Sequence, residues 1–191
     1  MAGLFMNPDQ YLYFFALVPP EDIQASITRI KEEFKERYNA SHALKSPPHI
    51  TLIPPFEYEK SSEETLINSL DEFSIRETCF QQRLEGFGSF PPRVLFIKVQ
   101  KNEALKELYF RFRRYMDNAL DISSLLRGPS KFSPHMTVAF RDLTRENFYL
   151  AKPEYEKKSI TFEFETDGIS LLRHNRKYWE IIHKSWFKAN K

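Results

Sequence analysis

The sequence predicts an α+β protein with two pseudo-symmetric lobes, each a mostly antiparallel sheet flanked by helices, and an active cleft between the lobes. Three observations lead to this prediction. Short apolar strands alternate with amphipathic helices, the stretch "PPHITLIPPF" returns in altered form as "SPHMTVAF", and the predicted elements follow a similar order in both halves of the chain. With 191 residues, 41% of them hydrophobic, the chain can bury a sizeable core. We therefore expect one bilobal domain over residues 1–191, made by internal duplication of about 11–90 and 91–191.

The first half reads as strand, helix, strand, helix and strand. Residues 11–19 are apolar and aromatic and end in two prolines, which is typical of a buried strand. Apolar side chains recur every three or four residues over 21–38, which predicts an amphipathic helix. A loop leads to the strand around His49, and "SSEE" then begins a short helix. Residues 78–90 predict a strand that frays at its two glycines.

The second half repeats this order. Residues 93–99 predict a strand, and 102–120 predict a helix with apolar side chains at helical spacing. A loop leads to the strand around His135. A short helix near 145–151 is followed by "AKPEYEKK", which we interpret as a solvated loop. The remaining residues predict strands, and the last two strands form a hairpin across the turn "HNRK".

Composition excludes several classes of function. The formal net charge of +2 gives no strong global field for a polyanion, although a local basic pocket could still attract one. The single cysteine, Cys79, excludes an intramolecular disulfide framework and a cysteine-rich metal site. Neither a dinucleotide fingerprint nor a P-loop occurs among the five glycines. No signal-peptide pattern or membrane-spanning apolar stretch is found, and we expect a cytoplasmic monomer without a membrane partner.

The two related stretches each place a histidine two residues before a threonine. Side chains two apart on a β-strand share a face, so His49 lies with Thr51 and His135 lies with Thr137. If the lobes are related by an approximate two-fold axis, the four side chains meet in the cleft. A lone histidine on a strand is more often a core residue. Here two of the five histidines have Pro before them and Thr two after, at matched positions of the repeat, which chance gives roughly once in ten thousand.

Two facing imidazoles and two hydroxyls suit phosphodiester cleavage. This reaction needs a base for the attacking oxygen, an acid for the leaving oxygen, and donors for the non-bridging oxygens. Histidine can take either proton-transfer role near neutral pH, since its ordinary pKa is near 6.5. The threonine hydroxyls would donate to the phosphoryl oxygens. No metal or other cofactor is required, and the sequence does not decide which histidine is the base.

The motifs "PPHITLIPPF" and "SPHMTVAF" resemble the paired motifs of the two-histidine phosphoesterase superfamily, which includes 2′-5′ RNA ligases (LigT-like proteins) and cyclic nucleotide phosphodiesterases. "GFGSFPPRVLFIKV" and "GISLLRHNRKYWEII" are also similar to segments of that family. The resemblance implies a bilobal fold, a central basic cleft and metal-independent chemistry on 2′,3′-cyclic phosphates or 2′-5′ linkages. The implied partners are RNA ends or small nucleotides, and the implied catalytic residues are His49, Thr51, His135 and Thr137.

Five further residues are candidates for substrate binding. Lys45 and Lys131 each lie four residues before a motif histidine and could steer an anion to the cleft, although surface lysine is the alternative. Arg93 could bind phosphate in bidentate fashion through its guanidinium group, or form a surface ion pair. Phe56 and Tyr13 could stack on a base, with core packing as the alternative. Weaker arginine candidates are Arg127, Arg141 and Arg173, and we interpret His42, His174 and His183 as structural.

Two other functions compete with metal-free catalysis. In a metallohydrolase the motif histidines would be metal ligands, but neither motif carries a carboxylate within two residues. Insensitivity of the activity to a chelator would remove this alternative. In a binding module the same cleft would hold an RNA end or a nucleotide without turnover.

Overall fold

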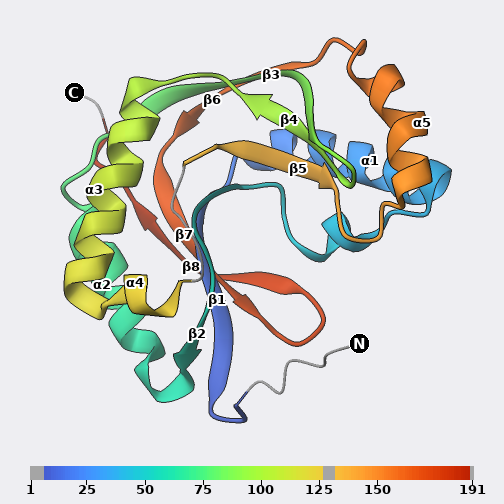
Figure 1. Cartoon of the computed structure of the whole chain (residues 1–191). Helices are drawn as coiled ribbons and strands as arrows, with labels where there is room; N and C mark the ends of the chain where they lie inside the picture. The colour runs from blue at the N-terminus through green and yellow to red at the C-terminus, as the bar shows by residue number, and fades with distance from the viewer. Residues whose placement is uncertain (1–6, 127–131, 190–191) are drawn as a thin grey trace.

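The computed structural model describes residues 7–126 and 132–189. Its strands and helices are interspersed along the chain, and the last three elements are all strands (Figure 1). The strands are β1 (Gln10–Leu17), β2 (Ile50–Glu59), β3 (Phe80–Phe90), β4 (Val94–Val99), β5 (His135–Ala139), β6 (Thr161–Thr166), β7 (Gly168–His174) and β8 (Trp179–Trp186). The helices are α1 (Glu21–Tyr38), α2 (Glu63–Ser74), α3 (Glu103–Leu120), α4 (Ile122–Leu125) and α5 (Arg145–Tyr155), with short 3-10 helices η1 (His42–Lys45) and η2 (Lys60–Ser62).

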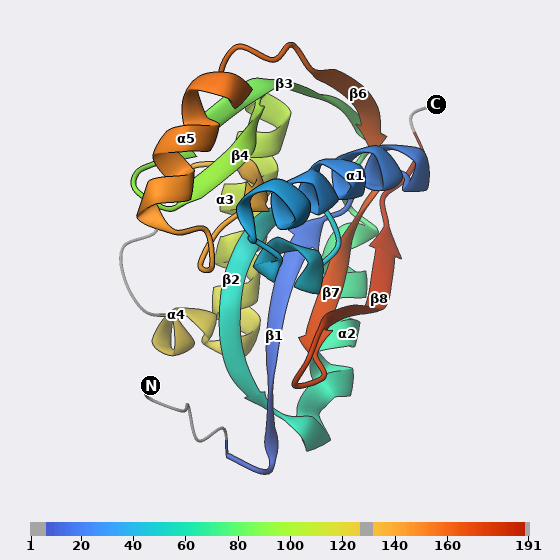
Figure 2. The same ribbon diagram turned by 90° about the vertical axis from the view of Figure 1, so that its right-hand side faces the viewer.

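The strands form two antiparallel sheets of four strands each. The order in the first sheet is β2-β1-β7-β8, and its strands lie side by side in Figure 2. The order in the second sheet is β5-β4-β3-β6, and the neighbours within both sheets are antiparallel. The predicted α+β class, the antiparallel pairing and the hairpin of β7 and β8 are therefore confirmed.

The two sheets take strands from both halves of the chain. β3 comes from the first predicted half but pairs with β4 and β6 in the second sheet. β7 comes from the second half but pairs with β1 in the first sheet, and β8 follows it there. The predicted halves, 11–90 and 91–191, therefore do not coincide with the sheets. The duplication of the sequence stays a prediction.

The helices cover the sheets from outside. α2 packs against β7 and β8, and α3 packs against β2, while α1 contacts β5 and α5 contacts β4 (Figure 1). The predicted periodicity of α1 is confirmed, because Ile23, Ile27 and Phe34 lie on its buried face. One cluster of buried side chains runs through both sheets and these helices, so the lobes share a core. Close packing in this shared core fixes the position of one sheet relative to the other.

Two local predictions were wrong. The third strand does not fray at its glycines but continues to Phe90, since Gly86 takes a left-handed φ of 67° and the pairing with β4 shifts register there. The segment "AKPEYEKK" is not a solvated loop throughout, because α5 extends to Tyr155 despite Pro153. Tyr155 is fully buried, with its ring 4.3 Å from that of Phe34 on α1. Tertiary burial therefore outweighs the local signal of proline and charge.

Candidate active site

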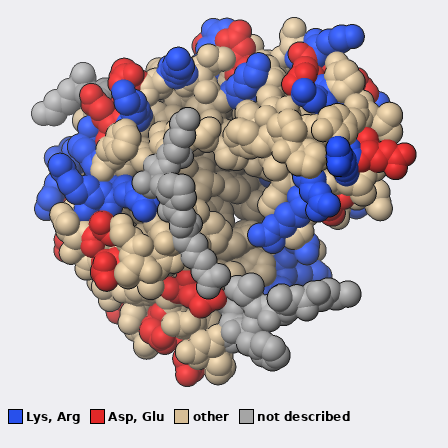
Figure 3. Space-filling model, viewed as in Figure 1, with Lys and Arg blue, Asp and Glu red and all other residues tan. Residues whose placement is uncertain are grey.

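A cavity lies between the two edge strands that carry the motifs. His49 directly precedes β2 and His135 begins β5, and each of these strands is at the edge of its sheet. His49, Thr51, His135 and Thr137 all line one cavity of about 510 Å³. Figure 3 shows a hollow on this face, with Lys and Arg side chains along one margin. The structure thus brings both His-x-Thr pairs together.

Each motif histidine is held by the same type of hydrogen bond. Nδ1 of His49 lies 2.7 Å from the carbonyl oxygen of Pro47, and Nδ1 of His135 lies 2.7 Å from that of Ser133. A carbonyl oxygen can only accept, so Nδ1 carries the proton and donates it in both residues. The bond leaves Nε2 of each ring to exchange protons with a bound molecule. Both imidazoles therefore have a fixed tautomer and a fixed orientation.

Aromatic rings pack against both histidines. Phe14 of β1 has its ring 4.8 Å from His49, and Trp179 of β8 lies edge-on to Phe14 at 4.6 Å. The second motif has a similar arrangement, with the rings of Phe90 and Phe96 at 5.1 and 5.2 Å from His135. The rings limit the rotation of the imidazoles. Sequence reasoning did not single out these aromatic residues.

Burial lowers the pKa of His49 to about 4, and the nearby Lys31 and His135 act in the same direction. The hydrogen bond to the Pro47 carbonyl acts in the opposite direction and is outweighed. His49 is consequently neutral at pH 7, with an unprotonated Nε2. A neutral imidazole of this kind can accept a proton from an attacking oxygen.

One end of the cavity is rich in cations and histidines. Nη1 of Arg141 lies 3.3 Å from Nε2 of His42, and the ring of His42 packs edge-on against Phe140 at 4.9 Å. His42 and His174 both line the cavity, and burial, followed by nearby cations, lowers the pKa of each. The cations that line the cavity are Lys45, Arg141, Arg176 and Lys177. An anion in the cavity would therefore be attracted to this end.

Two of these arginines have unusual backbones. Arg141 has a φ of 59° and Arg176 has a φ of 77°, both in the left-handed region that non-glycine residues rarely adopt. Such conformations cost about 1 kcal/mol or more each. Arg141 lies in the turn after β5 and Arg176 lies in the β7–β8 turn, and both line the cavity. Sequence patterns gave no signal for this geometry.

The remaining predicted residues have different positions. Lys45 lines the cavity, as expected. Arg93 is exposed in the turn after β3, outside the residues that line the cavity. Tyr13 and Phe56 are 0% and 2% exposed in the core, so neither ring can stack on a base in the cavity. Tyr13 points away because Phe14, its neighbour on β1, takes the cavity face. Lys131 and Arg127 lie outside the described residues.

The other arginine and histidine candidates lie elsewhere. Arg173 pairs with Glu63 at 2.8 Å, and His183 contacts Asp71 at 2.7 Å. His42 and His174, interpreted from sequence as structural, instead line the cavity. His42 begins η1 and His174 ends β7, and neither belongs to a His-x-Thr motif that would have marked it. Within residues 7–126 and 132–189 no group of three or more His, Cys, Asp or Glu could hold a metal ion, and no helix there is long and apolar enough to span a membrane.

Sequence comparison relates this chain to a known family. The family model of the 2′-5′ RNA ligase superfamily matches residues 19–177, which include both motifs. The chain belongs to this superfamily. A protein of Bacillus mycoides (strain KBAB4), named as a proposed phosphoesterase, is 37% identical over 154 residues, covering 80% of this chain and 84% of the relative. The relationship thus extends over most of both proteins.

Solved structures share the fold of this superfamily member. The Thermus thermophilus protein TT0787 has a TM-score of 0.69 at 20% identity, covering 94% of this chain and 100% of that protein. LigT of E. coli, solved with 3′-AMP, has a TM-score of 0.66 at 18% identity, covering 94% and 99%. LigT has also been solved with ATP and with NADP⁺. At these identities the likeness shows a common fold.

Proposed function

We propose that this member of the superfamily is a metal-independent phosphoesterase that hydrolyses 2′,3′-cyclic phosphate or 2′-5′ phosphodiester linkages of RNA ends or nucleotides. The observation that carries the proposal is the convergence of both His-x-Thr pairs on one cavity. The reverse reaction, 2′-5′ ligation of RNA, would use the same groups. The nucleotide complexes of LigT support a small nucleotide as the ligand of this cavity.

In the proposed reaction the two histidines act on opposite sides of the phosphorus atom. Nε2 of His49 takes a proton from the attacking water while the water oxygen forms a bond to phosphorus. The bond from phosphorus to the ribose oxygen breaks, and Nε2–H of His135 donates a proton to that oxygen. His49 is assigned as the base because its pKa is lowered to about 4, so it is unprotonated at neutral pH.

In the proposed reaction, hydroxyls and cations stabilise the negative charge of the phosphoryl group. Thr51 and Thr137 line the cavity beside their histidines and donate to the non-bridging oxygens. Lys45 and Arg141 are at the same cavity and attract the anionic substrate. Arg93 would take part only with a longer substrate, since it lies in an exposed turn. No step requires a bound metal.

The test is turnover of 2′,3′-cyclic nucleotides and 2′-5′ dinucleotides with chelator present, comparing the wild type with His49→Ala and His135→Ala. We expect chelator-resistant turnover that falls by about 10² to 10⁴ in each variant, since each loses one proton-transfer step. His183→Ala is a matched control, because His183 contacts Asp71 away from the cavity. Turnover abolished by chelator would instead support a metallohydrolase. Tight nucleotide binding without turnover would support a binding module.

A further inference from the structure

Lys31 is a buried lysine close to the proposed base. Its side chain is 2% exposed and lies on the inner face of α1, with Ile27 and Phe34. Lysines are rarely buried to this extent without a charged partner. Among the described residues no carboxylate forms an ion pair with Lys31. An apolar side chain would fill the same space without the cost of desolvation. We therefore ask which groups the ammonium of Lys31 contacts.

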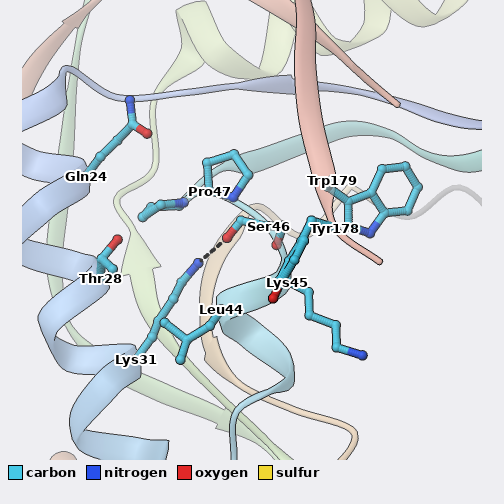
Figure 4. Close-up of a pocket in the computed structure, with 10 residues that line it drawn as sticks. Gln24, Thr28, Lys31, Leu44, Lys45, Ser46, Pro47, Tyr178 and Trp179 are labelled. Carbon is cyan, nitrogen blue, oxygen red and sulfur yellow. Dashed lines mark hydrogen bonds between the residues drawn. The ribbon is translucent and has the colours of Figure 1, made fainter. Parts of the chain in front are cut away.

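The ammonium group holds the segment that precedes His49. Nζ of Lys31 donates to the carbonyl oxygen of Ala43 at 3.1 Å and to that of Ser46 at 2.9 Å. Figure 4 shows Lys31 reaching from α1 to Ser46, while the side chain of Lys45 points away from it. The next residue, Pro47, supplies the carbonyl that accepts from Nδ1 of His49 at 2.7 Å. A continuous set of contacts therefore runs from α1 to the proposed base.

The second motif has no such support in the described part of the chain. His135 donates to the carbonyl of Ser133 in the same way, but no lysine there bonds the carbonyls of residues 132–134. The two histidines thus share one geometry, and a buried cation reinforces only one of them. His135 can serve as an internal reference for any effect on His49.

We propose that Lys31 is a positioning residue for His49. It fixes the carbonyls of Ala43 and Ser46, so that the Pro47 carbonyl keeps His49 in the Nδ1–H tautomer with Nε2 facing the substrate. The effect on rate rests on the proposed function, whereas the tautomer is a property of the folded protein alone. Outer-shell partners that orient metal-ligating histidines typically affect activity about 10- to 100-fold, and we expect an effect of the same order for the orientation of His49.

The charge of Lys31 has a second effect on the same imidazole. The groups that act on the charge of His49 are Lys31 from α1 and His135 from β5, and both lower its pKa. Burial lowers the pKa of Lys31 itself to about 7. A neutral amine keeps two N–H groups, which match the two carbonyls, so deprotonation leaves the positioning intact.

The experiment compares Lys31→Met with Lys35→Met, which removes an exposed lysine one turn further along α1. The first readout is the ¹⁵N spectrum of the histidine rings, which distinguishes the two tautomers. In Lys31→Met we expect His49 to populate both tautomers and His135 to keep one. We also expect kcat to fall about 10- to 100-fold with KM changed less than about twofold. The acid limb of the pH profile should move to higher pH, because the cation beside His49 is gone. Lys35→Met should match the wild type.

An unchanged His49 tautomer, kcat and pH profile in Lys31→Met would overturn the proposal. If this variant does not fold, Lys31→Gln gives the same readouts with a neutral amide at this position. Lys31→Arg keeps the charge and the N–H donors, and we expect it to restore the tautomer at least in part. If the wild type turns over none of the substrates, the proposed function fails, but the ¹⁵N spectra still decide the role of Lys31.

Discussion

The two motif histidines have the same hydrogen bond but different surroundings. Both donate from Nδ1 to a carbonyl oxygen two residues earlier. Aromatic rings pack against both imidazoles, but His49 also has the buried Lys31 nearby. The two histidines therefore have different electrostatic environments, and a general acid and a general base need such a difference. The assignment of His49 as the base follows from this inequality.

A pH profile tests that assignment. Because His49 must be unprotonated to act as the base, kcat/KM should fall on the acid side with an inflection near pH 4, far below the ordinary pKa of histidine near 6.5. Stability should also decrease as pH falls from about 6.5 to 4, since the unfolded chain binds a proton that the native His49 does not. Circular dichroism at each pH would show where the protein stays folded. An acid inflection near pH 6.5 would contradict the assignment.

The sequence located the motif residues because alternation along a strand is a strong constraint. It could place Thr51 with His49, since residues two apart share a face. The same rule failed for Tyr13, because the cavity face of β1 depends on which sheet face meets the other lobe. Phe14 takes that face, and Tyr13 donates instead to Glu63 at 2.9 Å. His42 reaches the cavity from the short 3-10 helix η1, where strand periodicity carries no information. His174 was predicted in the turn "HNRK" but is the last residue of β7, so alternation was not applied to it.

At the scale of elements, Asp142 joins two loops at the cation-rich end of the cavity. Its Oδ2 accepts from the backbone N–H of Ser41 and of His42, both at 2.8 Å, and from the Ser41 hydroxyl at 3.2 Å. Asp142 follows Arg141 after β5, while Ser41 and His42 precede β2. One carboxylate therefore fixes the η1 loop of one lobe against the loop of the other.

Replacing Asp142 tests whether this link positions the cavity. Asp142→Ala should lower the free energy of unfolding by about 1 to 3 kcal/mol, because the backbone N–H groups of Ser41 and His42 lose a charged acceptor. It should also raise KM several-fold, since Arg141 and His42 lose their common support. Asp117→Ala is a matched control, because Asp117 accepts from the backbone of Ser123 at 2.7 Å away from the cavity. Equal KM values in the two variants would contradict the link. Urea unfolding and steady-state kinetics measure both quantities.

The sequence predicted the position of an element correctly where the local spacing of apolar residues matches the face that the fold buries. The spacing of apolar residues predicted α1 and α3 because each buries one face. The end of α5 could not be predicted, since Pro153 and the charges favour a loop while burial of Tyr155 decides the outcome. Sheet membership could not be predicted either. That β3 joins β4 and β6, and β7 joins β1, depends on long-range pairing that local patterns do not encode.

At the scale of the whole molecule, charge is nearly balanced overall and concentrated locally. The net charge is +2, yet Lys45, Arg141, Arg176 and Lys177 all line one cavity. Among the described residues that line this cavity there is no Asp or Glu. A local field of this kind can attract an anionic nucleotide although the molecule as a whole does not attract polyanions.

Ionic strength and charge removal test this local field. Raising ionic strength from about 0.05 to 0.5 M shortens the range of exposed charges to a few ångströms, so kcat/KM for a nucleotide should fall several-fold, mainly through KM. The double variant Arg176→Gln/Lys177→Gln should lower kcat/KM about 3- to 10-fold and flatten its salt dependence.

The matched control is Lys35→Gln/Lys101→Gln, which removes two exposed lysines away from the cavity. Both double variants change the net charge by the same amount, from +2 to 2 − 2 = 0. A difference between them therefore reports the position of the charges and not their sum. Equal losses of kcat/KM in the two variants would mean that net charge alone attracts the substrate, and the cation-rich end of the cavity would then have no special part in binding.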